Sequence, residues 1–343
     1  MPVDAFIETC LGDPDHGYYR TRAPVGGAGD FTTAPEISQA FGELVGVWLG
    51  DRWLASGAPA AMRLVELGPG LGTLMEDALR ALAKTLPGFL EAARLHLVEI
   101  SRPMRKMQGE RLGRHAPVFH DRFDDVPDDA PLFLVANEFF DALAVRQFVR
   151  RGPVWHERMV TVADDGFAFA DGPPVAVPPL APAQLADSPD GAVAESCERA
   201  LEIAGAIGAR LARRGGAACV IDYGTARSGW GDTLQAVRAH RKVAVFEAPG
   251  ECDLTTHVDF PRLADAARRG GAAAFGPVTQ ADFLRRIGIH ARFATLAKVA
   301  APEARRRLEA ASRRLLDPAE MGTLFKVVAF QPADLPPPPG FEG

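Results

Sequence analysis

The sequence predicts an α/β protein built on a doubly wound, mostly parallel sheet. Two observations support this prediction. Short apolar runs alternate with amphipathic stretches between residues 63 and 137, and a similar alternation returns after residue 217. The chain has 343 residues, of which 47% are hydrophobic and 24% charged, so it can bury a large core. We therefore expect a sheet domain with additions at its front and late in the chain.

Seven strands are expected in this sheet, and the last of them is expected to run antiparallel. They are Arg63–Leu67, Leu95–Glu99, Pro117–His120, Pro131–Ala136, Ala217–Asp222, Ala272–Val278 and Leu324–Phe330. The fourth strand is apolar throughout, which is typical of a strand that is buried on both faces. The expected helices are Phe41–Trp53, Thr73–Lys84, Arg102–Leu112, Ala192–Arg214, Pro261–Arg269, Gln280–Ile287 and Pro302–Leu316.

The organisation along the chain follows from these elements. We expect an extension at 1–60 that packs over the ligand site, and a core at 61–222 that includes a hairpin and a proline-rich loop at about 145–190. Residues 223–270 contain several glycines and are expected to form an insertion or lid, and residues 271–331 complete the core. The proline-rich tail at 332–343 is expected to be disordered.

Composition excludes several classes of protein. The formal net charge is −6, so no global positive field attracts nucleic acid. The four cysteines are widely spaced, which favours neither a zinc site nor a disulfide framework. No apolar stretch approaches the roughly 20 residues of a membrane span, and the acidic start differs from transit and secretory signals. We expect a soluble cytoplasmic protein.

A glycine-rich turn gives the strongest local signal. The stretch Val65–Thr73 (VELGPGLGT) ends a strand with the acid Glu66 and opens a helix after three glycines, which let the backbone pass close to a ligand. A dinucleotide fold would have glycine at Thr73. Glu99 ends the next strand, where a carboxylate can bind ribose hydroxyls. This pattern favours S-adenosylmethionine as the cofactor, and a plain strand–turn–helix joint is the alternative.

A second polar group ends the fourth strand. Asn137, Glu138 and Asp141 should face the ligand crevice, because the carboxyl ends of parallel strands lie at that edge. An amide and carboxylates there can hold a cationic nitrogen and take its proton, while the adjacent phenylalanines exclude water. The alternative interpretation makes Glu138 and Asp141 acids at a helix start.

Two further segments supply candidate residues. Gly29–Gln39 is rich in hydroxyl and acidic side chains, with Pro35 and Glu36 placed to begin a helix, and it can fold over the cofactor. Asp222 ends the fifth strand at the same crevice, and His257 stands near a carboxylate. A histidine in such a place is more often structural than catalytic, and the spacing matches no metal site.

The residues resemble the MidA family of S-adenosylmethionine-dependent methyltransferases, which includes the mitochondrial complex I assembly methyltransferase. Several motifs occur in order over nearly the whole chain. They are HGYY at 16–19, GDFTTAPEISQAFGE at 29–43, VELGPGLGTLMEDALR at 65–80, LVEIS at 97–101, ANEFFDAL at 136–143, IDYG at 221–224, THVDF at 256–260 and MGTLFKVVAF at 321–330. Two departures are Ala144, where the family usually has proline, and the lack of a short leading segment, which suggests that Met1 is an internal start.

The resemblance implies a Rossmann-like methyltransferase fold, S-adenosylmethionine as cofactor, and a protein substrate that in mitochondrial members is an arginine of a complex I core subunit. It also implies roles for individual residues. The cofactor would be held by Thr32, Pro35, Glu36, Ser38, Glu66, Gly68, Gly70, Thr73, Glu99, Ile100, Asp121 and Asn137, and the acceptor would meet Asn137 and Glu138.

For the chemistry, Glu138 is our first choice as the group that orients a guanidino nitrogen and accepts its proton, with Asp222 and His257 as assisting candidates. Two alternatives stay open: a cofactor-binding assembly chaperone, and a methyltransferase of a small metabolite. An open groove beside Asn137 would favour a protein substrate, whereas a closed pocket lined by residues 223–257 would favour a small molecule. No metal is expected, and a homodimer is an open expectation.

Overall fold

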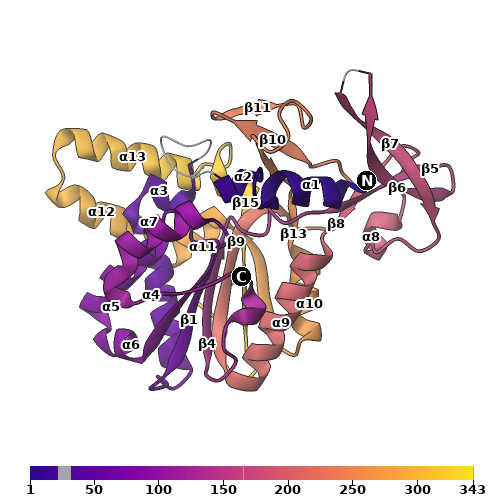
Figure 1. Cartoon of the computed structure of the whole chain (residues 1–343). Coiled ribbons are helices and arrows are strands. Elements are labelled where there is room, and N and C mark those ends of the chain that lie inside the picture. The colour runs from indigo at the N-terminus through magenta and orange to yellow at the C-terminus, as the bar shows by residue number, and fades with distance from the viewer. Residues whose placement is uncertain (22–31, 165, 343) are drawn as a thin grey trace.

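The computed structural model describes residues 1–21, 32–164 and 166–342. Its centre is a twisted sheet in which seven strands follow the order β14-β15-β9-β4-β1-β2-β3, and a short strand β13 pairs with β9 (Figure 1). The strands are β1 Met62–Leu67, β2 Ala93–Val98, β3 Val118–His120, β4 Leu132–Asn137, β9 Gly216–Thr225, β13 Val258–Asp259, β14 Ala273–Thr279 and β15 Phe325–Gln331. The seven predicted strands are confirmed.

The strand directions confirm a mostly parallel sheet. Strands β9, β4, β1, β2 and β3 pair in parallel, and β15 runs antiparallel to both β9 and β14. The chain order reverses beside β1, because β2 and β3 continue to one side of it while β4 and β9 lie on the other. In open α/β sheets, ligands bind outside the carboxyl ends of the strands at such a switch point.

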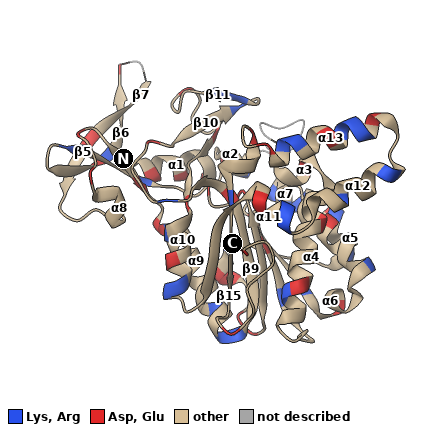
Figure 2. Ribbon diagram, turned by 180° about the vertical axis from the view of Figure 1, so that it is seen from behind, with Lys and Arg blue, Asp and Glu red and all other residues tan. Residues whose placement is uncertain are grey.

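Helices cover both faces of the sheet. One face packs against α4 Gln39–Ala55, α5 Thr73–Thr85, α6 Pro87–Ala92, α7 Arg102–Leu112, α11 Gln280–Arg286, α12 Ile289–Val299, α13 Pro302–Leu316 and the short α14 Met321–Leu324, and the other against α9 Glu198–Arg214 and α10 Phe260–Arg269. Successive residues of β4 alternate between the two apolar cores, Phe133 in one and Leu134 in the other. Charged residues lie mainly on the outer helices and at loops (Figure 2).

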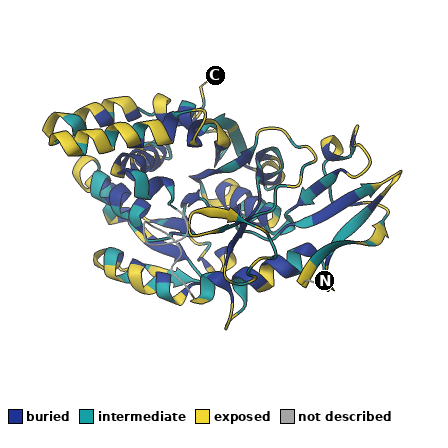
Figure 3. Ribbon diagram, turned by 90° about the horizontal axis from the view of Figure 1, so that it is seen from above, coloured by how far each residue is buried: buried dark blue, intermediate teal, exposed yellow. Residues whose placement is uncertain are grey.

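Helix α4 is buried along most of its length because it packs unusually close to α5. A Cβ at Gly46 would lie 2.6 Å from the Cα of Ala78, so only glycine permits this approach. The central strands and helices are buried, whereas most residues of the projecting pair α12 and α13 are exposed (Figure 3). In the part of the chain that the structure describes, we find no helix long and apolar enough to cross a membrane.

A four-stranded antiparallel sheet stands beside the core, in the order β7-β6-β5-β8. Its strands are β5 Arg146–Arg151, β6 Val154–Ala163, β7 Gly166–Val175 and β8 Val193–Ser196. The expected helix over 192–214 therefore begins only at Glu198, since residues 193–196 pair with β5. The expected proline-rich loop is shorter than predicted, because β7 extends to Val175 and α8 occupies Pro182–Leu185.

The front of the chain and the insertion pack together. The extension supplies α1 Val3–Gly12, α2 Tyr18–Thr21 and α3 Ala34–Ile37, and the insertion forms a three-stranded sheet of β10 Gln235–Arg238, β11 Arg241–Val243 and β12 Asp253–Thr255. Two short 3₁₀ turns, η1 Gly113–His115 and η2 Phe123–Asp125, complete the elements. Apolar side chains of α1 share one cluster with Val160 of β6 and Leu254 of β12.

The C-terminal tail differs from the disorder that its composition predicts. Within residues 332–342, backbone carbonyls accept hydrogen bonds from side chains of the body: Pro339 from Trp48 Nε1 at 3.0 Å and Pro336 from Arg52 Nη1 at 2.9 Å. The ring of Phe341 packs 5.5 Å from that of Phe283. Proline cannot supply a backbone donor, but its carbonyl remains an acceptor, and these carbonyls fix the tail.

Deleting residues 332–343 should lower the free energy of unfolding by about 2–4 kcal/mol, because the buried donors of Trp48 and Arg52 lose acceptors. Urea unfolding of the full chain and the shortened chain measures the difference. An unchanged midpoint would show that the tail contributes no stability.

Candidate active site

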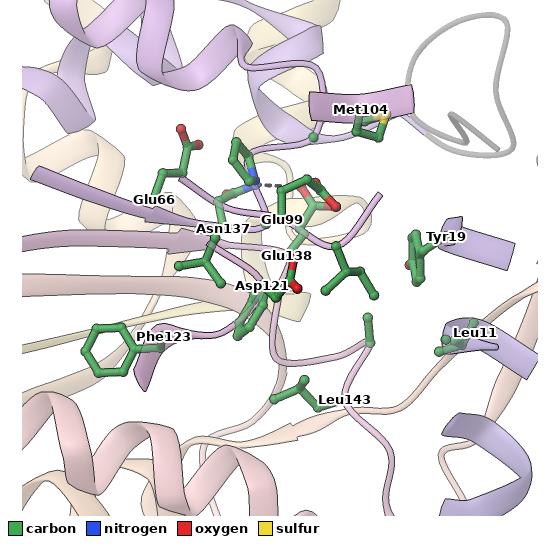
Figure 4. A pocket seen from close by; sticks show the side chains of 18 of the residues that line it. Leu11, Tyr19, Glu66, Glu99, Met104, Asp121, Phe123, Asn137, Glu138 and Leu143 are labelled. Carbon is green, nitrogen blue, oxygen red and sulfur yellow. Dashed lines mark hydrogen bonds between the residues drawn. The ribbon is translucent and has the colours of Figure 1, made fainter. Parts of the chain in front are cut away.

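A cavity of about 900 Å³ opens at the carboxyl ends of β1, β2 and β4. The register aligns Leu67 with both Val98 and Ala136, so the residues that follow these three positions meet at one edge of the sheet. Of the predicted site residues, the following line the cavity: Pro35, Glu36, Glu66, Gly68, Gly70, Thr73, Glu99, Ile100, Asp121, Asn137 and Glu138. Figure 4 shows Glu66, Glu99, Asn137 and Glu138 projecting from these strand ends.

The glycine turn between β1 and α5 has the conformation that its sequence predicts. Gly68, Gly70 and Gly72 all have positive φ, at 61°, 55° and 77°, a region that side chains disfavour. The turn is held by hydrogen bonds at both ends, from Gly68 N to the carbonyl of Val98 at 3.0 Å and from Gly72 N to that of Pro69 at 2.8 Å. The backbone therefore forms one wall of the cavity.

Glu66 places a buried carboxylate in this cavity, and few hydrogen bonds offset the cost of its burial. It is 2% exposed, and its Oε2 has no hydrogen-bond partner among the described residues. Burial raises the pKa of Glu66 well above its ordinary value. A buried carboxylate oxygen without a partner fits a ligand that brings its own positive charge, and S-adenosylmethionine carries an ammonium and a sulfonium.

Glu99 is positioned by groups on both sides. Its Oε1 accepts a hydrogen bond from Ser101 N at 2.7 Å, and its Oε2 accepts one from Gln108 Nε2 at 3.2 Å. The same Gln108 nitrogen also donates to the carbonyl of Gly70 at 2.8 Å. Burial raises the pKa of the Glu99 carboxyl, and the hydrogen bond from Ser101 opposes that shift. The carboxylate is therefore held in a fixed position at the end of β2.

Gln108 is a positioning residue that our sequence analysis missed. It is fully buried between Met104 and Leu112 on the inner face of α7, so a polar side chain stands where the helical period predicts an apolar one. That mismatch is the signal that could have revealed it.

Replacing Gln108 with leucine should weaken binding of S-adenosylmethionine by about tenfold, since Glu99 and the Gly70 carbonyl both lose a donor. Calorimetric titration with S-adenosylhomocysteine measures this change. Lys106→Leu, on the exposed side of the same helix, is the matched control. Equal dissociation constants for the two variants would contradict the role of Gln108.

Glu138 has an unusual backbone conformation at the end of β4. Its φ is +53°, which is rare for a residue with a long side chain and is concentrated at functional sites. Its Oε1 accepts hydrogen bonds from Ala34 N at 3.0 Å and from Asn137 Nδ2 at 3.1 Å. Burial, with a smaller contribution from the charge of Asp141, raises the pKa of Glu138 to about 7 against the opposing effect of the hydrogen bond from Ala34 N–H. A carboxyl with this pKa can exchange a proton near neutral pH.

Asp222 and Asp141 lie behind this turn and are not among the residues that line the cavity. Asp222 is fully buried, and its Oδ2 accepts hydrogen bonds from three consecutive backbone amides, those of residues 139, 140 and 141, at 2.9–3.2 Å. The side chain of Asp141 is buried and does not line the cavity, so its expected contact with the acceptor gains no support from this geometry. Asp222 thus accepts hydrogen bonds from the turn that follows Glu138 and does not line the cavity, and its assisting role stays a prediction.

His257 is separated from the other candidates. It lines a second cavity of about 190 Å³ with Thr233 and Asp259, and its ring packs edge-on against Tyr223 at 5.7 Å. The cavity that holds Glu138 contains no lining residue from 223–257 among those described. The expected assistance of His257 in catalysis, and the expected lid at 223–270, therefore have no support in this geometry.

The N-terminal loop contributes part of what was expected. Residues 29–31 lie outside the described part of the chain, and Thr32 is described but does not line the cavity. Pro35 and Glu36 of α3 do line it. Ser38 instead begins α4, where its Oγ accepts a hydrogen bond from Ala40 N at 3.2 Å.

The strand order, the glycine turn and the acid at the end of β2 together define a Rossmann-like methyltransferase that uses S-adenosylmethionine. Comparison with known proteins agrees. Residues 44–278 match the family model described as an S-adenosyl-L-methionine-dependent methyltransferase. A solved structure of a COG1565 superfamily member from Burkholderia thailandensis, bound to S-adenosyl-homocysteine, superposes with a TM-score of 0.83 and 31% identity, over 100% of this chain and 89% of that one.

Two curated relatives extend over nearly the whole chain. The protein arginine methyltransferase NDUFAF7 homolog of Drosophila melanogaster is 36% identical and covers 98% of this chain and 82% of its own. The human mitochondrial protein arginine methyltransferase NDUFAF7 is 35% identical, and the match covers 97% of this chain and 80% of the human protein. The chain belongs to the MidA family of S-adenosylmethionine-dependent methyltransferases.

Proposed function

We propose that the protein is a protein arginine N-methyltransferase that acts on a subunit of respiratory complex I. The observation that carries the reaction is Glu138, a strained carboxylate with a pKa of about 7 in the cavity beside the glycine turn. The arginine acceptor is inferred from relatives named protein arginine methyltransferase NDUFAF7. The complex I subunit is inferred from the resemblance to the MidA family, whose mitochondrial members act on such a subunit.

In this proposal each carboxylate has a separate task. Bound S-adenosylmethionine supplies a methyl group on a positively charged sulfur. Glu66 balances the positive charge of the cofactor, and Glu99 binds its ribose. Glu138 accepts a hydrogen bond from the acceptor guanidinium, which directs one nitrogen toward the methyl group, and takes the proton that this nitrogen loses. Asn137 donates to Glu138 Oε1 and so fixes its orientation.

Two observations favour this proposal over its alternatives. The insertion at 223–257 supplies none of the described cavity lining, and a closed pocket from that segment was the feature expected for a small-molecule acceptor. A chaperone that only binds the cofactor does not need a residue with a strained backbone, such as Glu138, beside the methyl group. A catalyst gains from one, because the strain fixes the position of the carboxylate.

The test is incubation of the purified protein with methyl-labelled S-adenosylmethionine and an extract of cells that lack its gene. Gly70→Arg serves as the control, because an arginine at this positive-φ glycine blocks the turn. We expect a labelled protein band that is absent from the control, with methylarginine in a complex I subunit by mass spectrometry. Label in small molecules alone supports the metabolite alternative, and no label supports the chaperone.

We also propose a cytoplasmic location and a homodimer. Cys10, Cys197 and Cys219 have free thiols, and Cys10 and Cys219 are buried, which supports a reducing compartment. Fractionation of cells and sedimentation of the purified protein test these two proposals.

A further inference from the structure

Helix α1 lines a part of the cavity to which none of the predicted cofactor-binding residues belongs. Ala5, Glu8, Thr9 and Gly12 all line it, and their spacing of i, i+3, i+4 and i+7 places them on one side of a helix. Tyr19 and Leu143 continue this wall. Figure 4 shows Leu11 and Tyr19 on the side opposite Glu66, with Glu138 between them.

This wall is held in place on its far side. Val3, Phe6 and Cys10 of α1 do not line the cavity and are buried in the cluster that includes Val160 and Leu254. Helix α1 therefore packs against both the four-stranded and the three-stranded sheet. This packing makes α1 a fixed wall of the cavity and not a movable lid.

Arg20 connects the C-terminal end of α1 to the segment that follows β2 through two hydrogen bonds. Its Nε donates to the carbonyl of Gly12 at 3.3 Å, and its Nη1 donates to the carbonyl of Ile100 at 3.1 Å. Ile100 directly follows Glu99, so the wall has a fixed position relative to the ribose site.

The charge of the wall is negative and unbalanced. Glu8 is exposed at the rim of the cavity and forms no ion pair with another described residue. Arg199, which also lines the cavity, is already engaged with Asp124 at 3.0 Å and with Glu202 at 3.1 Å. A ligand that passes over α1 therefore meets an uncompensated carboxylate, which attracts positive charge.

The wall is also open. Ala5 and Gly12 have the smallest side chains, and a Cβ at Gly12 would meet nothing within 4 Å. Gly12 has no positive φ, so a larger residue fits its backbone without strain. Space for an extended chain is thus present beside α1.

We propose that this face of α1 binds the acceptor as an extended peptide segment in which a basic residue flanks the target arginine. This inference rests on the proposed function and adds the class of substrate. The target side chain reaches Glu138, its neighbouring backbone lies along Ala5 and Gly12, and the flanking cation pairs with Glu8.

The first test narrows the channel. Gly12→Phe should raise the KM for the acceptor protein at least tenfold and leave the dissociation constant of S-adenosylhomocysteine unchanged. Gly113→Phe is the matched control, because its Cβ also meets nothing within 4 Å and Gly113 lies outside the cavity lining. An unchanged KM in Gly12→Phe, with the folded state verified by circular dichroism, would overturn the proposal.

The second test reverses the charge. The probes are short peptides with a central arginine flanked by lysines or by glutamates, and wild-type protein should methylate the lysine peptide at least tenfold faster. Glu8→Lys should abolish or invert this preference, whereas Glu91→Lys, an equal charge change at an exposed position of α6, should preserve it.

The outcomes separate this inference from the proposed function. A preference that survives in Glu8→Lys overturns the charge pairing. A wild-type protein that labels a band in the cell extract but no peptide overturns binding of an extended segment. An extract without any labelled protein contradicts the proposed function itself.

Discussion

Replacing Glu138 with glutamine should lower turnover by about 10²–10⁴-fold and change the dissociation constant of S-adenosylmethionine only a few-fold. The amide keeps the size of the side chain, and its oxygen can still accept the hydrogen bond from Ala34 N. It cannot take the proton that a guanidinium must lose. Single-turnover rates and calorimetric binding measure the two effects separately, and unchanged turnover would remove Glu138 from this role.

The pH dependence provides an independent check of the same residue. The pKa of Glu138 is raised to about 7, so the carboxyl is protonated at lower pH and cannot accept a proton there. Turnover of the wild-type protein should therefore rise with pH through an apparent pKa near 7. The residual activity of Glu138→Gln should lack this rise. If the variant keeps the same acid limb, another group is responsible for it.

Replacing Asp222 with alanine should cost about 3–5 kcal/mol of unfolding free energy and lower turnover by about 10²-fold or more. The change leaves the buried amides of residues 139–141 without their acceptor, and this turn holds Glu138 in its strained conformation. Thermal unfolding and turnover are the measurements.

Asp222→Asn is the matched variant, because its oxygen can still accept from the turn. It should recover most of the stability and part of the turnover. Cofactor binding should change little in either variant, since Asp222 does not line the cavity. An alanine variant that is destabilised but turns over normally would show that the turn does not position Glu138.

The sequence predicts the central sheet well because the signals of its strands are local. The apolar strand Leu132–Asn137 is buried on both faces, and β1 and β2 are each followed by a helix that packs on the sheet. The errors occur where pairing with distant residues decides the structure. Residues 193–196 form a strand because they pair with β5, and the proline-rich tail is ordered because Trp48 and Arg52 donate to it.

The candidate site divides in the same way. The glycine turn, Glu66 and Glu99 stand at predictable strand ends, so their place in the cavity follows from the βα pattern. Sequence reasoning ranked Glu138 above Asp222 but placed both in the ligand crevice, because both stand at the ends of predicted strands at one edge of the sheet. Only the packing shows that Asp222 points under the turn and that His257 belongs to another cavity.

The hydrogen bonds of Asp222 also set the order in which the site can assemble. Residues 62–137 contain the glycine turn and Glu99, whereas Asp222 joins the turn at 139–141 across more than 80 positions of sequence. Glu138 likewise bonds through its backbone to Ile221. During synthesis at about 5–20 residues per second, the ribosome adds this partner several seconds after Glu138 itself. A nascent chain can therefore form the part of the site that contains the glycine turn and Glu99 before Glu138, the proposed proton acceptor, is held in position.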